Sequence, residues 1–173
     1  MTHRKKGANF MLKNEVFGRS AGGCNKVFKR SLIYDYFDEN LRICEDNLFL
    51  IQYCRNIKKG GFINKAFYHV FERENSAMRA CPGRLVDGLV IRERIIDISF
   101  GIGENIGRVA EEDFLDSCIL MLSNMREIYQ DECKFAESVL SKYLKKNLLR
   151  VVTNDKIDLK MRIKYVMRML KRQ

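Results

Sequence analysis

The sequence has little of what marks disordered or membrane-spanning proteins. Its 173 residues include one proline and eleven glycines, which argues against a loop-rich or low-complexity protein. It has no run of about 18 apolar residues, so we do not expect a transmembrane helix. The basic N-terminus, residues 1–6, is not followed by an apolar segment, and we therefore do not expect a signal peptide.

The cysteines also lack a familiar pattern. The six cysteines include no Cys-x-x-Cys pair, which is the spacing typical of structural zinc sites, so we do not expect zinc. Scattered reduced thiols are typical of a cytosolic protein, and we expect the chain to be cytoplasmic.

Apolar residues and positive charge are what the chain has in quantity. Hydrophobic residues make up 46% and aromatic residues 10% of the sequence, which favours a packed core in one domain or in parts of two. The net charge of +10 is uneven, because residues 142–173 carry eleven Lys and Arg against Asp155 and Asp158. This segment is therefore predicted to meet an anionic surface.

The pattern changes near Pro82, and we place a domain boundary between residues 1–81 and residues 82–173. The first part has a mixed pattern, and we predict an α/β domain there. Its predicted elements are an extended segment at 24–28, a helix at 45–56, and strands at 62–64 and 67–71.

The second part is predicted to be an all-α extension. Apolar residues recur at helical spacing in four stretches, which are 84–100, 111–132, 134–149 and a final helix capped by Asp155. The glycines of residues 101–107 resemble a dinucleotide-binding loop. The third glycine is one position late and no strand precedes it, so we expect a helix–helix connection.

Glu45 and Asp46 open the helix predicted in the first part. The free N–H groups and the dipole of a first helical turn favour negative charge there. A carboxylate in this position can take a proton from a sugar hydroxyl. Helix capping alone also explains such acids, so the pair by itself has two interpretations.

Short motifs surround this pair in a recognisable order. They are Gly22-Gly23-Cys24-Asn25-Lys26-Val27-Phe28-Lys29-Arg30, then Phe37-Asp38-Glu39-Asn40-Leu41-Arg42 and Glu45-Asp46-Asn47-Leu48-Phe49, then Phe67-Tyr68-His69 with Arg73 and Ser76 beyond. In their order and spacing, residues 20–80 resemble the C-terminal part of the catalytic domain of bacterial family 2 glycosyltransferases, which have the GT-A fold. The segment after Pro82 is similar to the helical extension that these enzymes often carry.

The resemblance implies roles for individual residues. Asp46 would be the general base that deprotonates the acceptor hydroxyl, and Glu45 would help to shape the acceptor pocket. Arg73 and Ser76 would lie near the donor diphosphate, where guanidinium and hydroxyl groups suit phosphate oxygens. The reaction would be an inverting, in-line displacement at the anomeric carbon of a nucleotide sugar, onto a saccharide or lipid-linked acceptor of cell-surface polysaccharide synthesis.

Three further residues belong to the implied donor or acceptor site. Asn25 and Lys26 come from the first motif and His69 from the last. An ordinary structural role remains open for His69, because histidine is of intermediate burial in proteins. The charge of Lys26 is equally explained as a solvated group at a strand end.

The chain departs from the family on the donor side. Family members begin with a nucleotide-binding half whose Asp-x-Asp motif holds Mg²⁺ or Mn²⁺, and this sequence contains no Asp-x-Asp. We therefore expect Mg²⁺ or Mn²⁺ only in a full-length enzyme and no metal site in this chain. We interpret the chain as a truncated or split transferase, inactive in isolation, or as a decayed fragment.

The last segment, residues 155–172, allows a second function. Its apolar positions, such as Ile163, share a helix with six basic residues, and such a helix can lie on an anionic membrane surface at the inner face of the plasma membrane. A packed helix with a solvated basic face is the alternative. A non-catalytic helical module that binds through this tail is the competing function, and nucleic acid is not favoured because no nucleic-acid-binding motif occurs.

Overall fold

The computed structural model describes residues 4–7, 23–41, 43–63, 65, 67–69, 71, 84–124 and 130–170. Within these ranges most residues belong to five α-helices, which are α2 (Glu45–Cys54), α4 (Arg84–Ile102), α5 (Glu104–Asn124), α6 (Gln130–Thr153) and α7 (Leu159–Leu170). Strands β1 (Arg4–Gly7) and β2 (Lys59–Phe62) pair antiparallel, with Arg4 opposite Phe62. A single 3-10 turn, η2, covers Arg30–Leu32.

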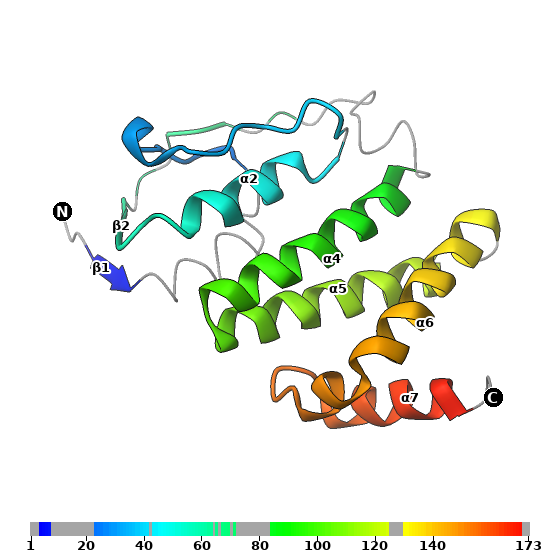
Figure 1. Ribbon diagram of the computed structural model, residues 1–173. Helices are drawn as coiled ribbons and strands as arrows, with labels where there is room; N and C mark the ends of the chain where they lie inside the picture. The colour runs from blue at the N-terminus through cyan, green and yellow to red at the C-terminus, as the bar shows by residue number, and fades with distance from the viewer. Residues whose placement is uncertain are drawn as a thin grey trace.

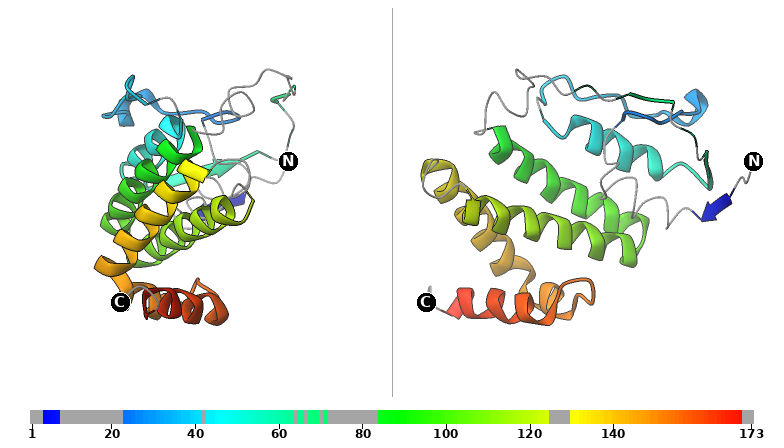
Figure 2. Two further views of the ribbon diagram at one scale, coloured as in Figure 1. Left: turned by 90° about the vertical axis from the view of Figure 1, so that its right-hand side faces the viewer. Right: turned by 180° about the vertical axis from the view of Figure 1, so that it is seen from behind.

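The helices form successive layers (Figure 1). Residues 23–41 run over α2, and α2 lies over the hairpin of α4 and α5. Helix α6 leads from this hairpin to α7, which forms the edge of the molecule farthest from residues 23–41 in each view (Figure 2). None of the helices in the described ranges is both long enough and apolar enough to cross a membrane.

The larger hydrophobic core lies among α4, α5, α6 and α7. Phe114 and Leu115 of α5 and Leu140 and Leu144 of α6 are completely buried in it, and Tyr165 brings α7 into the same cluster with 1% of its surface exposed. Each buried side chain of this size contributes about 1.5–3 kcal/mol relative to an exposed one. This cluster therefore fixes the arrangement of the four helices.

A second core attaches α2 to the hairpin. Leu48 and Ile51 of α2 share a buried cluster with Ile91 and Ile95 of α4 and Ile106 of α5. Residues from both sides of Pro82 thus pack together, and the helix that carries the acid pair is held on the helical bundle.

The predicted α/β fold, with a partial GT-A-like domain, is wrong. Within the described residues the sheet is limited to the β1–β2 pair, and helices predominate. Residues 67–69 contain no strand, and β2 ends at Phe62 instead of continuing through Ile63.

Aromatic residues of the segment that runs over α2 pack on that helix. The ring of Phe28 lies edge-on to Phe49 and Tyr53 of α2, with centroid distances of 5.2 and 5.1 Å. The ring of Phe37 stacks on Phe49 at 4.6 Å. Strand propensity largely reflects packing on a half-buried surface, and α2 supplies such a surface without a hydrogen-bonded ladder.

The helices predicted from apolar periodicity are present, with different ends. Helix α5 begins at Glu104 instead of residue 111. Ile106, Val109 and Ala110 of its first turns are buried, and Glu104 pairs with Arg108 at 2.9 Å one turn later. The helix–helix connection expected at residues 101–107 is confirmed. It consists of Gly103, which lies between α4 and α5.

The predicted cap of the last helix is also wrong. Asp158 caps α7, since its Oδ2 accepts a hydrogen bond from the backbone N–H of Lys160 at 3.0 Å. Asp155 instead pairs with Lys156 at 3.2 Å and with Arg108 at 3.4 Å. Both aspartates fit the sequence signal for a cap, and the difference lies in the length of the turn between α6 and α7.

Candidate functional site

The acid pair occupies the first turn of α2, as predicted. Glu45 and Asp46 are half-buried, and Oδ1 of Asp46 accepts a hydrogen bond from the N–H of Asn47 at 2.8 Å. Within the described part of the chain, Oδ2 of Asp46 and the carboxylate of Glu45 have no hydrogen-bond partner. One oxygen of Asp46 thus stabilises the helix end, and the other remains able to accept a proton.

The residue before the pair has an unusual backbone. Cys44 is the N-cap of α2 and has φ of 58° and ψ of 13°, a left-handed conformation that L-residues other than glycine, asparagine and aspartate rarely adopt. Its Sγ lies close to α4, because a methyl group added at Gly88 would be 3.3 Å from that sulfur. The direction in which α2 starts therefore depends on this turn and on its contact with α4.

The first motif lies along α2 and begins beside Asp46. A methyl group added at Gly23 would lie 4.0 Å from Cβ of Asp46. Farther along, the N–H of Lys29 donates to the hydroxyl of Tyr53 at 2.9 Å, and the amide of Asn56 donates to the carbonyl of Leu32 at 3.2 Å. The motif therefore follows α2 from its first turn to its last.

Asn25 and Lys26 follow Cys24 in the first motif. Asn25 is exposed in a left-handed turn, with φ of 59°. Nζ of Lys26 donates a hydrogen bond to the carbonyl of Cys24 at 3.5 Å. Burial raises the pKa of Cys54 to about 11, and the positive charge of Lys26 opposes that rise.

The last motif is only partly described. The hydroxyl of Tyr68 donates to Sγ of Cys24 at 3.5 Å, which places residues 67–69 beside the start of the first motif. His69 is exposed in this segment. Arg73 and Ser76 lie outside the described residues.

Large apolar side chains are exposed around this site. They occur in the two segments that flank α2, at residues 23–41 and 63–71. This outer aromatic surface consists of Val27, Tyr34, Tyr36, Phe37, Ile63, Phe67, Tyr68 and Phe71, each at least half exposed. Large apolar side chains exposed in such number are typical of a face that another molecule covers.

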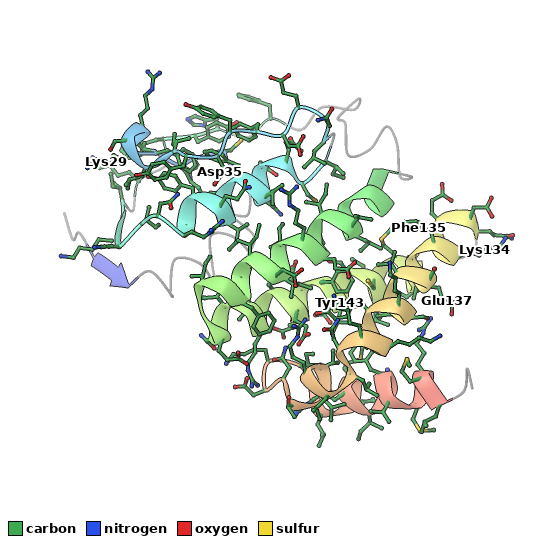
Figure 3. All side chains as sticks on the ribbon, viewed as in Figure 1. Lys29, Asp35, Lys134, Phe135, Glu137 and Tyr143 are labelled. Atoms are coloured by element: carbon green, nitrogen blue, oxygen red, sulfur yellow. The ribbon has the colours of Figure 1, made fainter. Side chains whose placement is uncertain are left out.

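Away from the acid pair, a hollow with a volume of about 490 Å³ lies among α5, α6 and α7. Its charged residues include Glu137 and Arg168, which form an ion pair at 2.8 Å, and Lys134. Figure 3 shows Lys134 and Glu137 on α6, far from the residues around Asp35. Nη2 of Arg168 is paired with Glu137, whereas the buried Nε of Arg168 has no hydrogen-bond partner among the described residues.

The described residues offer no ready metal centre. Within them, no group of three or more His, Cys, Asp or Glu side chains is arranged to hold a metal ion. Described Cys24, Cys44, Cys54, Cys118 and Cys133 are all free thiols.

Sequence reasoning did not anticipate one buried polar centre, at Glu111 of α5. It is fully buried and bonds to Tyr143, Arg150 and Asn154. The signal was present, because Glu111 lies one helical turn before Leu115 on the apolar face of α5.

Comparison with known proteins adds no assignment. No family model, curated protein or solved structure matches the chain.

Proposed function

We propose that this chain is the acceptor-side part of an inverting glycosyltransferase similar to family 2, with Asp46 as the general base. One observation carries the proposal: the motifs that the resemblance places in order meet at the start of α2. Gly23 lies beside Asp46, and Tyr68 bonds to Cys24, the residue next to Gly23. Glu45 lies in the same helical turn and would line the acceptor pocket.

In the proposed reaction, Asp46 accepts the proton of the acceptor hydroxyl. The acceptor hydroxyl oxygen forms a bond to the anomeric carbon while the bond from that carbon to the donor phosphate breaks. The hydroxyl proton passes to Oδ2 of Asp46, and a nucleoside diphosphate leaves. Oδ1 is held by the N–H of Asn47, so the carboxylate is oriented before the acceptor binds, which favours efficient general-base catalysis.

The donor side is assigned to a nucleotide-binding half that carries Mg²⁺ or Mn²⁺. The metal would balance the charge of the leaving diphosphate. The described residues of this chain do not fit such an ion. The outer aromatic surface, which flanks the acid pair, is the face that we assign to contact with the nucleotide-binding half.

The experiment is to join the chain to the nucleotide-binding half of a family 2 transferase. Nucleoside diphosphate release is then measured with a panel of nucleotide sugars and saccharide acceptors. We expect acceptor-dependent turnover that falls by a factor of roughly 10²–10⁴ in Asp46→Asn, the usual contribution of a general base.

The matched control is Asp35→Asn, which neutralises an exposed acid in the segment that covers α2. This variant should keep turnover close to that of the parent protein. Near-normal turnover of Asp46→Asn, with its helical content unchanged, would contradict the assignment of the base.

A non-catalytic binding module is the second candidate, and the charge of α7 favours it. This helix carries Lys160, Arg162, Lys164 and Arg168 and no acid. Salt-dependent binding to an anionic polymer such as duplex DNA, equal in the parent and in Asp46→Asn, together with no transfer by the joined protein, would favour this function over the transferase.

A further inference from the structure

Helix α7 is attached to the bundle by one face only. Tyr165 lies in the larger core, and Nη2 of Arg168 donates to Oε1 of Glu137 on α6 at 2.8 Å. Nη1 of Arg162 donates to the carbonyl of Val152 at 3.1 Å. The inward face thus uses an aromatic anchor and two of the four basic residues.

The outward face is apolar and exposed. Leu159, Ile163, Met167 and Leu170 are exposed by 62%, 55%, 49% and 60%. Their spacing of three and four residues places them in one stripe along the helix. The sequence predicted an apolar face here but not that it would point away from the core.

Positive charge borders this stripe. Lys160 and Lys164 are exposed and follow Leu159 and Ile163 directly in sequence. Helix α7 contains no Asp or Glu, and residues 171 and 172, which follow it, are also basic. The exposed surface therefore combines apolar side chains with unopposed positive charge.

The position of α7 allows a flat contact along its whole length. In Figures 1 and 2 it lies at the edge of the molecule, beneath α6 and away from α2. A helix of 12 residues is about 18 Å long, so several lipid headgroups can lie beneath it.

We infer that α7 binds the surface of an anionic lipid bilayer, with the stripe in the acyl boundary and Lys160 and Lys164 among the headgroups. Basic helices with one apolar face bind membranes in this way. The inference does not depend on the proposed transferase activity.

Two other occupants fit less well. A second copy that paired stripe to stripe would bring the lysines of both helices together, and α7 has no acid to neutralise them. Nucleic acid would satisfy the lysines but would leave Leu159, Ile163, Met167 and Leu170 against phosphates or water. The headgroups of an anionic bilayer can bind the lysines, and its acyl boundary can cover the apolar stripe.

The test is flotation of the full chain with vesicles of two compositions. One contains phosphatidylserine and phosphatidylcholine in equal parts, and the other contains phosphatidylcholine alone. We expect binding to the anionic vesicles that weakens as salt is added. A basic residue near a membrane surface is worth about fivefold in affinity, so Lys160→Gln with Lys164→Gln should weaken binding roughly 25-fold.

The stripe has its own variant and controls. Ile163→Ser with Met167→Ser changes exposed side chains only, so the fold should persist while vesicle binding is lost. Lys29→Gln with Lys58→Gln removes two exposed lysines near α2, and Leu120→Ser changes an apolar side chain of α5 that is 60% exposed. Both controls should bind as the parent does.

Three results would overturn the inference. One is the absence of binding to phosphatidylserine vesicles, and another is equal binding to both vesicle compositions. The third is a folded stripe variant that binds like the parent. A concentration-dependent dimer that Ile163→Ser dissociates, without vesicle binding by the parent, would show that a second copy covers the stripe.

Discussion

Glu111 and Arg150 form an ion pair across α5 and α6 in which the acid is completely buried. Oε1 of Glu111 accepts a hydrogen bond from Nε of Arg150 at 2.8 Å, and the arginine side chain is 33% exposed. The same oxygen accepts from the hydroxyl of Tyr143 at 2.7 Å, and Oε2 accepts from the amide of Asn154 at 2.9 Å. The guanidinium also lies 4.4 Å above the ring of Phe100 on α4. One carboxylate therefore joins α5, α6 and the turn before α7.

The first prediction concerns the charge of this carboxylate. Glu111→Gln should lower the free energy of unfolding by about 3 kcal/mol, because breaking a buried ion pair leaves its partner without compensation. Urea unfolding followed by circular dichroism measures the change. Glu104→Gln is the matched control, since Glu104 is 67% exposed in its pair with Arg108 and should cost less than about 1 kcal/mol. Equal decreases in the free energy of unfolding of the two variants would show that the burial of Glu111 adds no stability beyond that of an exposed ion pair.

The second prediction concerns pH. Burial raises the pKa of Tyr143, and the neighbouring Glu111 charge raises it further. A tyrosine whose pKa is higher in the folded state stabilises the protein fully below the unfolded pKa of about 10. That contribution is lost as the pH rises through the folded pKa. The free energy of unfolding should therefore fall above about pH 10 more steeply in the parent than in Tyr143→Phe.

Tyrosinate absorbance provides an independent check on this residue. The absorbance due to Tyr143 should appear only well above about pH 10, the usual pKa of tyrosine, or on unfolding. A titration of the folded protein in which the difference between the parent and Tyr143→Phe appears near about pH 10 would contradict the expected direction of the shift.

The third prediction compares two glycines at the α4–α5 hairpin. A methyl group at buried Gly107 would overlap the ring of Phe100, whereas one at Gly101 would have no atom within 4 Å. Gly107→Ala should therefore destabilise the protein by about 1–3 kcal/mol through overpacking. Gly101→Ala, in the last turn of α4, should stabilise it by about 0.5 kcal/mol, since alanine loses less backbone entropy on folding. Thermal unfolding of both variants gives the comparison, and a stable Gly107→Ala variant would mean that the Phe100 ring can move.

Helix positions were readable from the sequence because apolar periodicity records which side of a helix is buried. The stripe from Leu115 to Leu122 predicted α5, but the start of this helix was missed. Ile106, Val109 and Ala110 of its first two turns are buried at helical spacing. The glycines of residues 101–107 were instead interpreted as a connection.

The strands predicted at 62–64 and 67–71 rested on aromatic and β-branched residue types. Ile63, Phe67 and Phe71 are more than half exposed. Residues of these types form strands where they pack on a half-buried surface, and sequence alone does not show that such a surface is missing.

The candidate site was predictable in part for a related reason. The placement of Glu45 and Asp46 in a first helical turn followed from local sequence alone. The position of the first motif depends on how residues 23–33 lie along α2, and this path is set by distant contacts such as Lys29 with Tyr53.

The orientation of Glu45 and Asp46 also depends on a glycine of α4. Gly88 of α4 allows Cys44 to come close, and Cys44 is the left-handed residue that immediately precedes Glu45. A larger residue at position 88 would push the beginning of α2 outward and re-aim both carboxylates without altering either of them. The geometry of the acid pair therefore depends on the interior of the helical bundle, at a position far from both acids in sequence.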